Sequence, residues 1–350
     1  MRFPKFLKKN GTIGFVAPSF GCATEPYLTG FKSAQEKFKA LGYNCKLGDN
    51  CYKAEGVGIS NKPELCGKEL MDMYMDGESD VIISCGGGEL MCETISHVDF
   101  DVLAEAEPKW YMGYSDNTNF TFLQTTICDT AAIYGSCAAT FGMDEWHPAL
   151  EDAMGLLTGE KLSLKSYDGW EKESLKSEEN PTAPWNITEP RVLKVYKDGI
   201  LTDCSESVVE TGFKGRLVGG CMDCLVNLTG TKYDKVKEFN ARYKEDGIIW
   251  FLESCDLNVF AIRRAMWQME NAGWFDNVKG FIIGRPLVFG QDMMGLDQYS
   301  AVLSVAAKYN VPVIMDCDLG HLAPTMPLIS GAMAEVVLKD NDLNVNMILE

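Results

Sequence analysis

The stretch KWYMGYSDNTNF, residues 109–120, changes abruptly from an apolar and aromatic run to polar residues. The run up to Met112 predicts a buried strand, and the polar residues after the turn begin a helical pattern. A strand that ends in a tight turn, with a serine at its tip and a helix behind it, presents a hydroxyl for attack on a substrate. Ser115 is therefore a candidate nucleophile whose partners must come from elsewhere in the chain.

The rest of the first half repeats this alternation. Strand-like runs at 12–19 (TIGFVAPS) and 80–88 (DVIISCGGG) alternate with amphipathic helical patterns at 27–43 and 64–79. Strands that alternate with helices indicate parallel strands joined by crossover helices, and such sheets bind ligands at the carboxyl ends of their strands. We expect an α/β fold with a doubly wound parallel sheet over residues 1–160, the domain that carries the nucleophile.

The second half predicts a smaller, strand-rich α/β domain. Residues 161–190 are polar and lack either periodicity, which indicates a linker or extended loop. The domain that follows, 191–350, contains apolar strand-like runs at 247–254, 278–286 and 311–321.

Composition narrows the functional class. The chain has 350 residues, 46% of them hydrophobic and 23% charged, which suits two soluble globular domains. A formal charge of −18 argues against nucleic acid as a partner, because phosphate binding needs clustered Lys and Arg. No run approaches the roughly 20 apolar residues of a membrane span, so we expect no membrane insertion.

Cysteines and histidines limit the chemistry. The 13 cysteines are scattered and odd in number, and no signal peptide precedes them, so free thiols in a reducing cytoplasm are expected. Cys221 and Cys224 have CxxC spacing but lack a second pair, which favours buried thiols over a metal site. Of the three histidines, His97 and His147 are expected at the surface, whereas His321 follows an apolar strand and a glycine, where a general base would suit.

Glu253 ends an apolar run, IIWFLE, which is expected to be buried. A buried carboxylate rarely lacks a partner, so one is expected for Glu253. Two interpretations are open. The carboxylate either orients the His321 imidazole as the acid of a triad, or it forms a salt bridge with Arg263 or Arg264 on the following helix.

The glycines of CGGGE, residues 85–89, match neither G-x-x-x-x-G-K-[ST] nor G-x-G-x-x-G, so phosphate cradling is a weak interpretation. The bare N–H groups of Gly86 and Gly87, with the amide of Asp116, suit an oxyanion hole. The alternative is a turn that needs glycine for a positive φ. Strand ends that supply nucleophile, acid, base and oxyanion donors together favour a hydrolytic triad.

These residues also carry a resemblance. GYSDNT with its upstream GG turn, FLE before a helix, and GH in DLGHLAPTMPLISG resemble the LD-carboxypeptidase family of serine peptidases, as do GTIGFVAPS and KGRLVGGCMDCL. This family includes the muramoyl-tetrapeptide carboxypeptidases and the microcin C self-immunity proteins.

The resemblance implies a two-domain homodimeric enzyme without metal or cofactor. It assigns the nucleophile to Ser115, the acid to Glu253 and the base to His321, with oxyanion amides from Gly86, Gly87 and Asp116. Two features depart from the common family pattern. Cys85 stands where many members have arginine, and the polar segment with its tryptophans is closer to the self-immunity branch.

The implied substrate is a small peptide or a peptidyl nucleotide. We expect release of terminal D-Ala from a muropeptide tetrapeptide, and the alternative is cleavage of an aminoacyl or peptidyl nucleotide with Trp185 stacked on the base. The substrate's terminal carboxylate needs a cation, for which Lys214, Arg216 and Arg285 are candidates. An esterase is a further alternative, although GYSDN lacks the second glycine of G-x-S-x-G, and a small-molecule binding protein with a buried Glu–Arg pair is another.

Overall fold

The computed structural model describes residues 1–350, and the chain folds into two compact units. The N-terminal unit comprises residues 1–161, 173–186 and 327–329, and the C-terminal unit comprises residues 162–172, 187–326 and 330–350. The chain therefore crosses between the units several times, whereas the sequence predicts one linker over 161–190.

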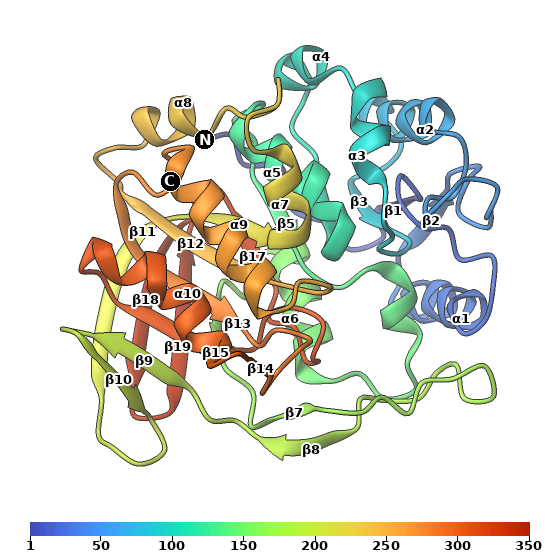
Figure 1. Ribbon diagram of the computed structural model, residues 1–350. Coiled ribbons are helices and arrows are strands. Elements are labelled where there is room, and N and C mark those ends of the chain that lie inside the picture. Colours follow the sequence, from blue (N-terminus) through green and yellow to red (C-terminus); the bar gives the residue numbers. More distant parts are fainter. The chain divides into compact units, whose positions relative to one another are not determined.

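The N-terminal unit is built on a six-stranded sheet with the strand order β17-β5-β4-β3-β1-β2 (Figure 1). The pairs β1–β2, β1–β3, β3–β4 and β4–β5 are all parallel. The strands are β1 Thr12–Val16, β2 Asn44–Leu47, β3 Val81–Ser84, β4 Trp110–Gly113, β5 Ala132–Tyr134 and β17 Leu328–Ser330.

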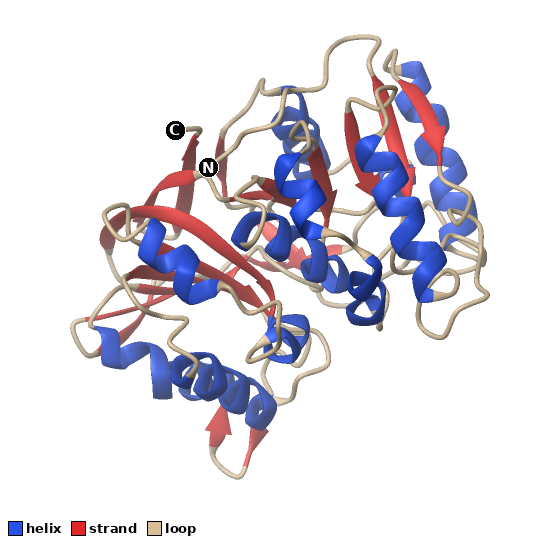
Figure 2. Cartoon of the chain, turned by 90° about the horizontal axis from the view of Figure 1, so that it is seen from above, coloured by secondary structure: helices blue, strands red, loops and turns tan.

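Helices lie on both sides of these strands (Figure 2), which confirms the predicted doubly wound parallel sheet. The α-helices are α1 Tyr27–Ala40, α2 Pro63–Met75, α3 Met91–Thr94, α4 Phe100–Glu105, α5 Thr118–Thr126 and α6 Pro148–Thr158. Three 3₁₀ turns complete the unit: η1 Ile95–His97, η2 Ser115–Asn117 and η3 Ala138–Gly142.

The order β2-β1-β3-β4-β5 contains a switch point between β1 and β3. At such a point, loops from neighbouring strands diverge and leave a crevice at the carboxyl ends of the strands. The glycine turn at 85–88 follows β3, and Ser115 follows β4. The topology therefore brings the predicted nucleophile and the predicted oxyanion donors to one edge of one sheet.

Sequence patterns did not reveal β2 and β5. β2 is an edge strand with the polar sequence NCKL and little burial, so it lacks the apolar run that marks the central strands. β5 has only three residues and lies shortly after α5, where the helical pattern hides it.

The C-terminal unit contains a nine-stranded mixed sheet with the order β10-β9-β16-β13-β12-β11-β18-β19-β6. Its centre, β11-β12-β13-β16, is parallel, and both flanks are antiparallel. The strands are β6 Ser163–Lys165, β9 Lys194–Lys197, β10 Ile200–Asp203, β11 Glu210–Cys221, β12 Ile248–Glu253, β13 Val278–Gly284, β16 Val313–Cys317, β18 Met333–Lys339 and β19 Asp342–Ile348.

Short elements complete this unit. Two hairpin-like pairs join β7 (Gly169–Glu171) to β8 (Ile187–Pro190) and β14 (Asp292–Met293) to β15 (Leu296–Asp297). The helices are α7 Met222–Leu228, α8 Val236–Arg242, α9 Val259–Asn271, α10 Gln298–Ala306 and the 3₁₀ turn η4 Ala307–Tyr309. Strands β6, β7 and β8 all fall inside the stretch predicted to be a linker. They are short and polar, so their pairing depends on partners distant in the sequence.

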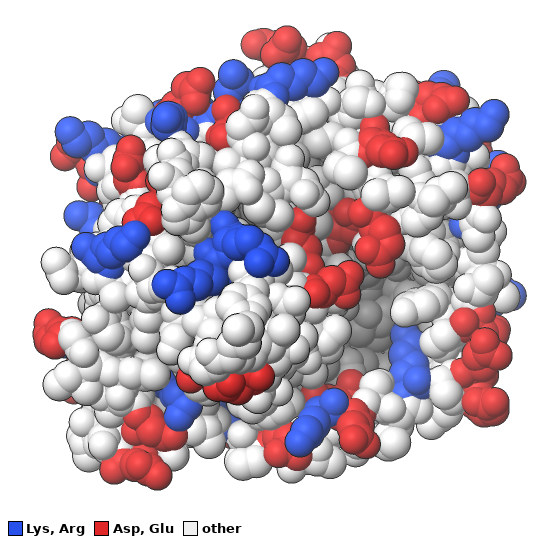
Figure 3. Space-filling view, viewed as in Figure 1, with Lys and Arg blue, Asp and Glu red and all other residues white.

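Several whole-chain features bear on function. All 13 cysteines are free thiols, and no helix combines the length and apolarity that crossing a bilayer requires. No group of three or more His, Cys, Asp or Glu side chains is arranged to hold a metal ion. On the face drawn in Figure 3, acidic and basic side chains are interspersed.

Candidate active site

Ser115 occupies a strained turn directly after β4. Its φ is +62°, in the left-handed region that a residue with a Cβ adopts at a cost on the order of 1 kcal/mol. Its N–H group donates to the Tyr134 hydroxyl over 3.2 Å, and the residue is half-buried. A non-glycine residue in this conformation at a strand end is typical of a turn that holds a nucleophile, which is the role that the sequence analysis predicts for Ser115 and which stays a prediction.

The next residue, Asp116, anchors this turn. Its carboxylate is 3% exposed and accepts hydrogen bonds from the Ser19 hydroxyl at 2.5 Å, the Met91 N–H at 2.9 Å and the Asn119 amide at 2.9 Å. Ser19 lies in the loop after β1, Met91 begins α3, and Asn119 lies in α5. A buried carboxylate with several donors is held rigidly, so Asp116 fixes the backbone that carries Ser115.

The glycine turn lies against Ser115, the predicted nucleophile. A Cβ on Gly87 would be 3.3 Å from the Ser115 Oγ, and the Asn117 amide donates to the Gly86 carbonyl over 2.9 Å. The N–H groups of Gly86 and Gly87 have no acceptor in the chain. Neither glycine has a positive φ, so the turn needs glycine for close approach and not for backbone conformation.

The sequence patterns did not single out Ser19 as a residue of the candidate site. It ends the VAPS stretch after β1, and a Cβ on Gly88 would meet its Oγ at 2.2 Å. Its position one loop beyond a central strand was the available signal.

We predict that Asp116→Asn lowers kcat about 10- to 100-fold while KM changes little, because a misplacement of about 1 Å costs that much in rate. The amide replaces an acceptor oxygen with a donor, which faces the Ser19 hydroxyl and the Met91 N–H. Asp99→Asn is the matched control, since Asp99 accepts from two backbone N–H groups at the start of α4, away from Ser115. Steady-state kinetics of both variants measure the effect, and an unchanged kcat in Asp116→Asn would contradict the anchoring role.

In the C-terminal unit, His321 and Glu253 form a pair. Glu253 is the last residue of β12 and is 1% exposed, and its Oε2 lies 2.9 Å from the His321 Nδ1. With Nδ1 bound to the carboxylate, the other ring nitrogen, Nε2, is the one able to exchange a proton with a substrate or nucleophile. Arg263 and Arg264 are exposed on α9, so the alternative salt bridge is absent.

Glycines make room for this pair. Gly320 has a φ of +102°, and a Cβ there would lie 2.5 Å from the Glu253 Oε2. A Cβ on Gly284, at the end of β13, would lie 3.0 Å from the Glu253 Cβ. A side chain at Gly320 would displace the carboxylate from the imidazole, and one at Gly284 would also meet the Leu319 carbonyl oxygen, 2.3 Å from its Cβ.

A half-buried aspartate fixes the turn after Glu253. The two carboxylate oxygens of Asp223, on α7, accept the backbone N–H groups of Cys255 at 3.0 Å and Asp256 at 2.8 Å. The Cys255 thiol also interacts with the His321 imidazole and contributes to raising its pKa. Neither contact was predicted, because both depend on residues that meet only in the folded unit.

Burial of His321 works to lower its pKa, but the Glu253 charge and the interactions that the imidazole makes with Cys255 and with the accepting Glu253 carboxylate raise the pKa well above its ordinary value. The pair therefore stabilises an imidazolium. By linkage, its contribution to stability is full below the pKa of an unfolded histidine and is lost as pH rises through the raised pKa of the folded state.

We predict that Glu253→Gln moves the acidic limb of the kcat/KM profile to lower pH, because the imidazole must be neutral to act as a base and the amide no longer raises its pKa. The maximal rate falls roughly 10⁴-fold, the size of effect seen when the orienting acid of a triad becomes an amide. pH-rate profiles of both forms test this. An acidic limb that stays in place or moves to higher pH would show that Glu253 does not set the His321 pKa.

Other predicted residues have different surroundings. His97 is exposed, and His147 caps α6 by accepting the Ala149 N–H. Trp185 is half-buried in the N-terminal unit with its ring centroid 5.1 Å from that of His147. Trp170 is buried in the C-terminal unit.

Two of the three cations predicted to bind the substrate's carboxylate already form ion pairs within the chain. Arg216 is 4% exposed and bonded to Asp246, and Arg285 is 1% exposed and bonded to Asp318. Lys214 is half exposed with a longer contact of 3.4 Å to Glu335. The two arginines are therefore poor candidates for a terminal carboxylate.

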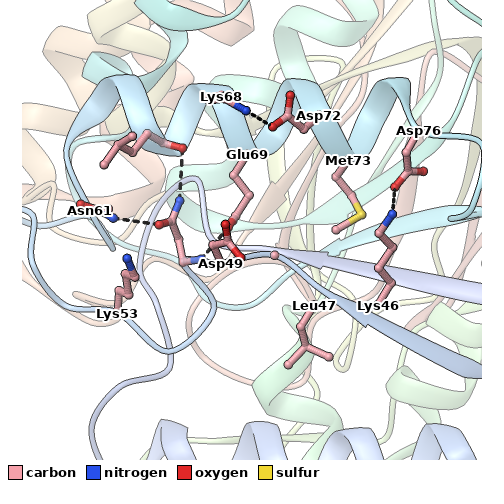
Figure 4. Close-up of a pocket in the computed structure, with 13 residues that line it drawn as sticks. Lys46, Leu47, Asp49, Lys53, Asn61, Lys68, Glu69, Asp72, Met73 and Asp76 are labelled. Atoms are coloured by element: carbon pink, nitrogen blue, oxygen red, sulfur yellow. Dashed lines mark hydrogen bonds and ion pairs between the residues drawn. The ribbon is translucent and has the colours of Figure 1, made fainter.

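A cavity of about 560 Å³ lies between β2 and α2 in the N-terminal unit (Figure 4). No predicted site residue lines it. Several of its charged side chains are paired: Lys46 pairs with Asp76 and Lys68 with Asp72, and the Glu69 carboxylate accepts the N–H groups of Ala17 and Asn50.

The two halves of the chain match known family models. Residues 13–135 match the LD-carboxypeptidase N-terminal domain, and residues 214–336 match the LD-carboxypeptidase C-terminal domain. The fold and these matches define a serine-type carboxypeptidase. The chain belongs to the LD-carboxypeptidase family.

Similar proteins support this assignment. A protein of Treponema pallidum (strain Nichols) named "Putative carboxypeptidase" is 22% identical over 335 residues, 94% of this chain and 90% of that protein. The MccF-like protein of Bacillus anthracis str. Ames has a TM-score of 0.79 at 18% identity, over 99% of this chain and 100% of its own. MccF in complex with glutamyl sulfamoyl guanosine has a TM-score of 0.78 at 19% identity, over 99% and 98% of the two chains.

Proposed function

We propose that this protein is an LD-carboxypeptidase that releases terminal D-Ala from a muropeptide tetrapeptide, with Ser115, His321 and Glu253 as its triad. The observation that carries the proposal is the 2.9 Å contact between the His321 Nδ1 and the buried Glu253 carboxylate. This contact fixes the imidazole tautomer that a general base needs. Outside catalysis, a histidine held this way would have little use for an exchangeable Nε2.

In the proposed reaction, His321 removes the proton from Ser115 as its Oγ attacks the carbonyl carbon of the amide bond. The tetrahedral oxyanion accepts hydrogen bonds from the Gly86 and Gly87 N–H groups and the Asp116 amide, each worth about 3 kcal/mol in comparable sites. Breakdown breaks the C–N bond, and His321 gives its proton to the departing D-Ala amine. Water then attacks the acyl-enzyme, with His321 as base, and releases the shortened peptide and Ser115.

The ion pairs of Arg216 and Arg285 bear on which group binds the D-Ala carboxylate. Because Arg216 and Arg285 are already bound to carboxylates, the D-Ala carboxylate is bound by other groups, and Lys214 stays a candidate. The proposal also includes a cytoplasmic role in peptidoglycan recycling and a homodimer, as the family resemblance implies.

A second candidate is hydrolysis of an aminoacyl or peptidyl nucleotide, as in microcin C immunity. It is favoured by the similarity to MccF, a protein solved with glutamyl sulfamoyl guanosine. Trp185, half-buried beside His147, would stack on the base, a contact worth about 1–3 kcal/mol in other sites.

Mass spectrometry of products distinguishes the two. The protein and its Ser115→Ala variant are incubated with a muropeptide tetrapeptide ending in D-Ala and, separately, with an aminoacyl-sulfamoyl adenosine. We predict loss of D-Ala with the unaltered protein only, and unchanged activity on the tetrapeptide in Trp185→Ala.

Cleavage of the nucleotide conjugate alone, weakened in Trp185→Ala, would favour the immunity-type hydrolase instead. Cleavage of neither compound would overturn both assignments and return the esterase and binding-protein interpretations. A serine-directed fluorophosphonate then separates these two, since a binding protein shows no Ser115-dependent labelling.

A further inference from the structure

We propose that Arg285 and Asp318, a buried ion pair of the C-terminal unit, are positioning residues that hold the His321 loop so that Nδ1 meets Glu253. The inference rests on the role of His321 proposed above and gives Arg285 a positioning role in place of the carboxylate-binding role considered for it from the sequence.

Arg285 follows β13 directly and is 1% exposed. Its guanidinium donates to the Asp318 carboxylate and, over 2.7 Å, to the Asp316 carbonyl. Its own N–H donates to the Cys317 carbonyl over 3.3 Å. One arginine therefore contacts three consecutive residues of the chain that leads to His321.

Asp318 links Arg285 to the loop 318–326 and to the segment around Tyr167. Its second carboxylate oxygen accepts the Tyr167 N–H over 2.8 Å, and its carbonyl accepts the Met326 N–H over 2.7 Å. Within the loop, the Thr325 hydroxyl donates to the Gly320 carbonyl over 2.5 Å. The segment 318–326 is thus closed into a ring at its base, with His321 on it.

An aromatic side chain seals the ion pair from solvent. The Arg285 guanidinium lies 5.3 Å from the Trp170 ring centroid, and Phe289 packs on Trp170 at 5.0 Å. Removal of one partner from a buried pair leaves an uncompensated charge, so the remaining carboxylate or guanidinium would draw the loop out of place.

The His321 loop has little tolerance for such a shift. Gly320 adjoins His321 and already lies so close to Glu253 that a Cβ would sit 2.5 Å from its Oε2. A displacement of the loop base therefore changes the Nδ1 to Oε2 contact directly. This is the geometric reason to expect an effect on proton transfer and not on stability alone.

The same unit offers a matched control. Arg216, at 4% exposed, pairs with Asp246, donates to the Gly331 carbonyl over 2.6 Å and lies 4.1 Å from the Tyr243 ring centroid. It has the same burial, charge pairing and aromatic contact as Arg285, but it does not touch segment 317–326.

The experiment compares Arg285→Met, Arg285→Lys, Asp318→Asn and the control Arg216→Met in the full chain. Two quantities are measured: kcat and KM on the substrate identified above, and the His321 pKa by NMR titration, which is practical because the chain has only three histidines. Thermal unfolding of each variant reports stability separately.

We expect Arg285→Met and Asp318→Asn to lower kcat about 10- to 100-fold with KM within about threefold, and to lower the His321 pKa toward its ordinary value. Arg285→Lys should recover part of both. Arg216→Met should lose comparable stability while its kcat and His321 pKa remain unchanged.

Equal losses of kcat in Arg285→Met and Arg216→Met, or an unchanged His321 pKa in Arg285→Met and Asp318→Asn, would overturn the proposal. If the proposed catalytic role of His321 is wrong, the result is different: a His321→Gln variant would still hydrolyse the substrate. The NMR titration reads the position of His321 whatever the substrate, so the two failures are distinguishable.

Discussion

The burial of one carboxylate, Glu253, constrains much of the C-terminal unit. Five apolar residues of β12 lead to it, and the strand is buried along its whole length. An ionised carboxylate in such a place costs several kcal/mol unless it is paired and hydrogen-bonded. His321 supplies the partner, and Gly284 and Gly320 leave the space in which the two side chains meet. The arrangement of β12, β13 and the loop after β16 therefore follows from the need to satisfy this one charge.

The N-terminal unit uses the same device at Ser115. A second buried carboxylate, Asp116, accepts hydrogen bonds from the loop after β1, from the start of α3 and from α5, and it helps to hold Ser115 in a left-handed conformation. In both units, the candidate residues lie at the carboxyl ends of parallel strands or in the loops that follow them. A buried carboxylate, Asp116 in the N-terminal unit and Glu253 in the C-terminal unit, restrains each loop through its hydrogen bonds. The strain at Ser115 and the tight contact at Gly320 then persist because the surrounding hydrogen bonds over-determine them.

The sequence predicts the central strands well, because β1, β3, β4, β12, β13 and β16 are short apolar runs that end in glycine or polar residues. It predicts Ser115, Glu253 and His321 as candidates for the same reason. It does not predict β2, β5 or the strands within 161–190, whose pairing depends on distant partners and not on local pattern. The sequence also does not reveal the residues that support the candidate site, which are Ser19, Asp223, Asp318 and Arg285. Their importance lies in contacts between loops that are 30 to 150 residues apart, as with Tyr167 and Asp318, and no periodicity records such contacts.

The measurement that tests the central claim most directly is a kinetic double-mutant cycle on Ser115→Ala, His321→Ala and the combined variant. A triad acts as a unit, so each single change should lower kcat on the order of 10⁶-fold and the pair together little more. All three proteins must be shown to be folded, by unfolding curves that match that of the unaltered chain. Losses that nearly multiply in the double variant would mean that Ser115 and His321 act independently, and the account given for this protein would be wrong.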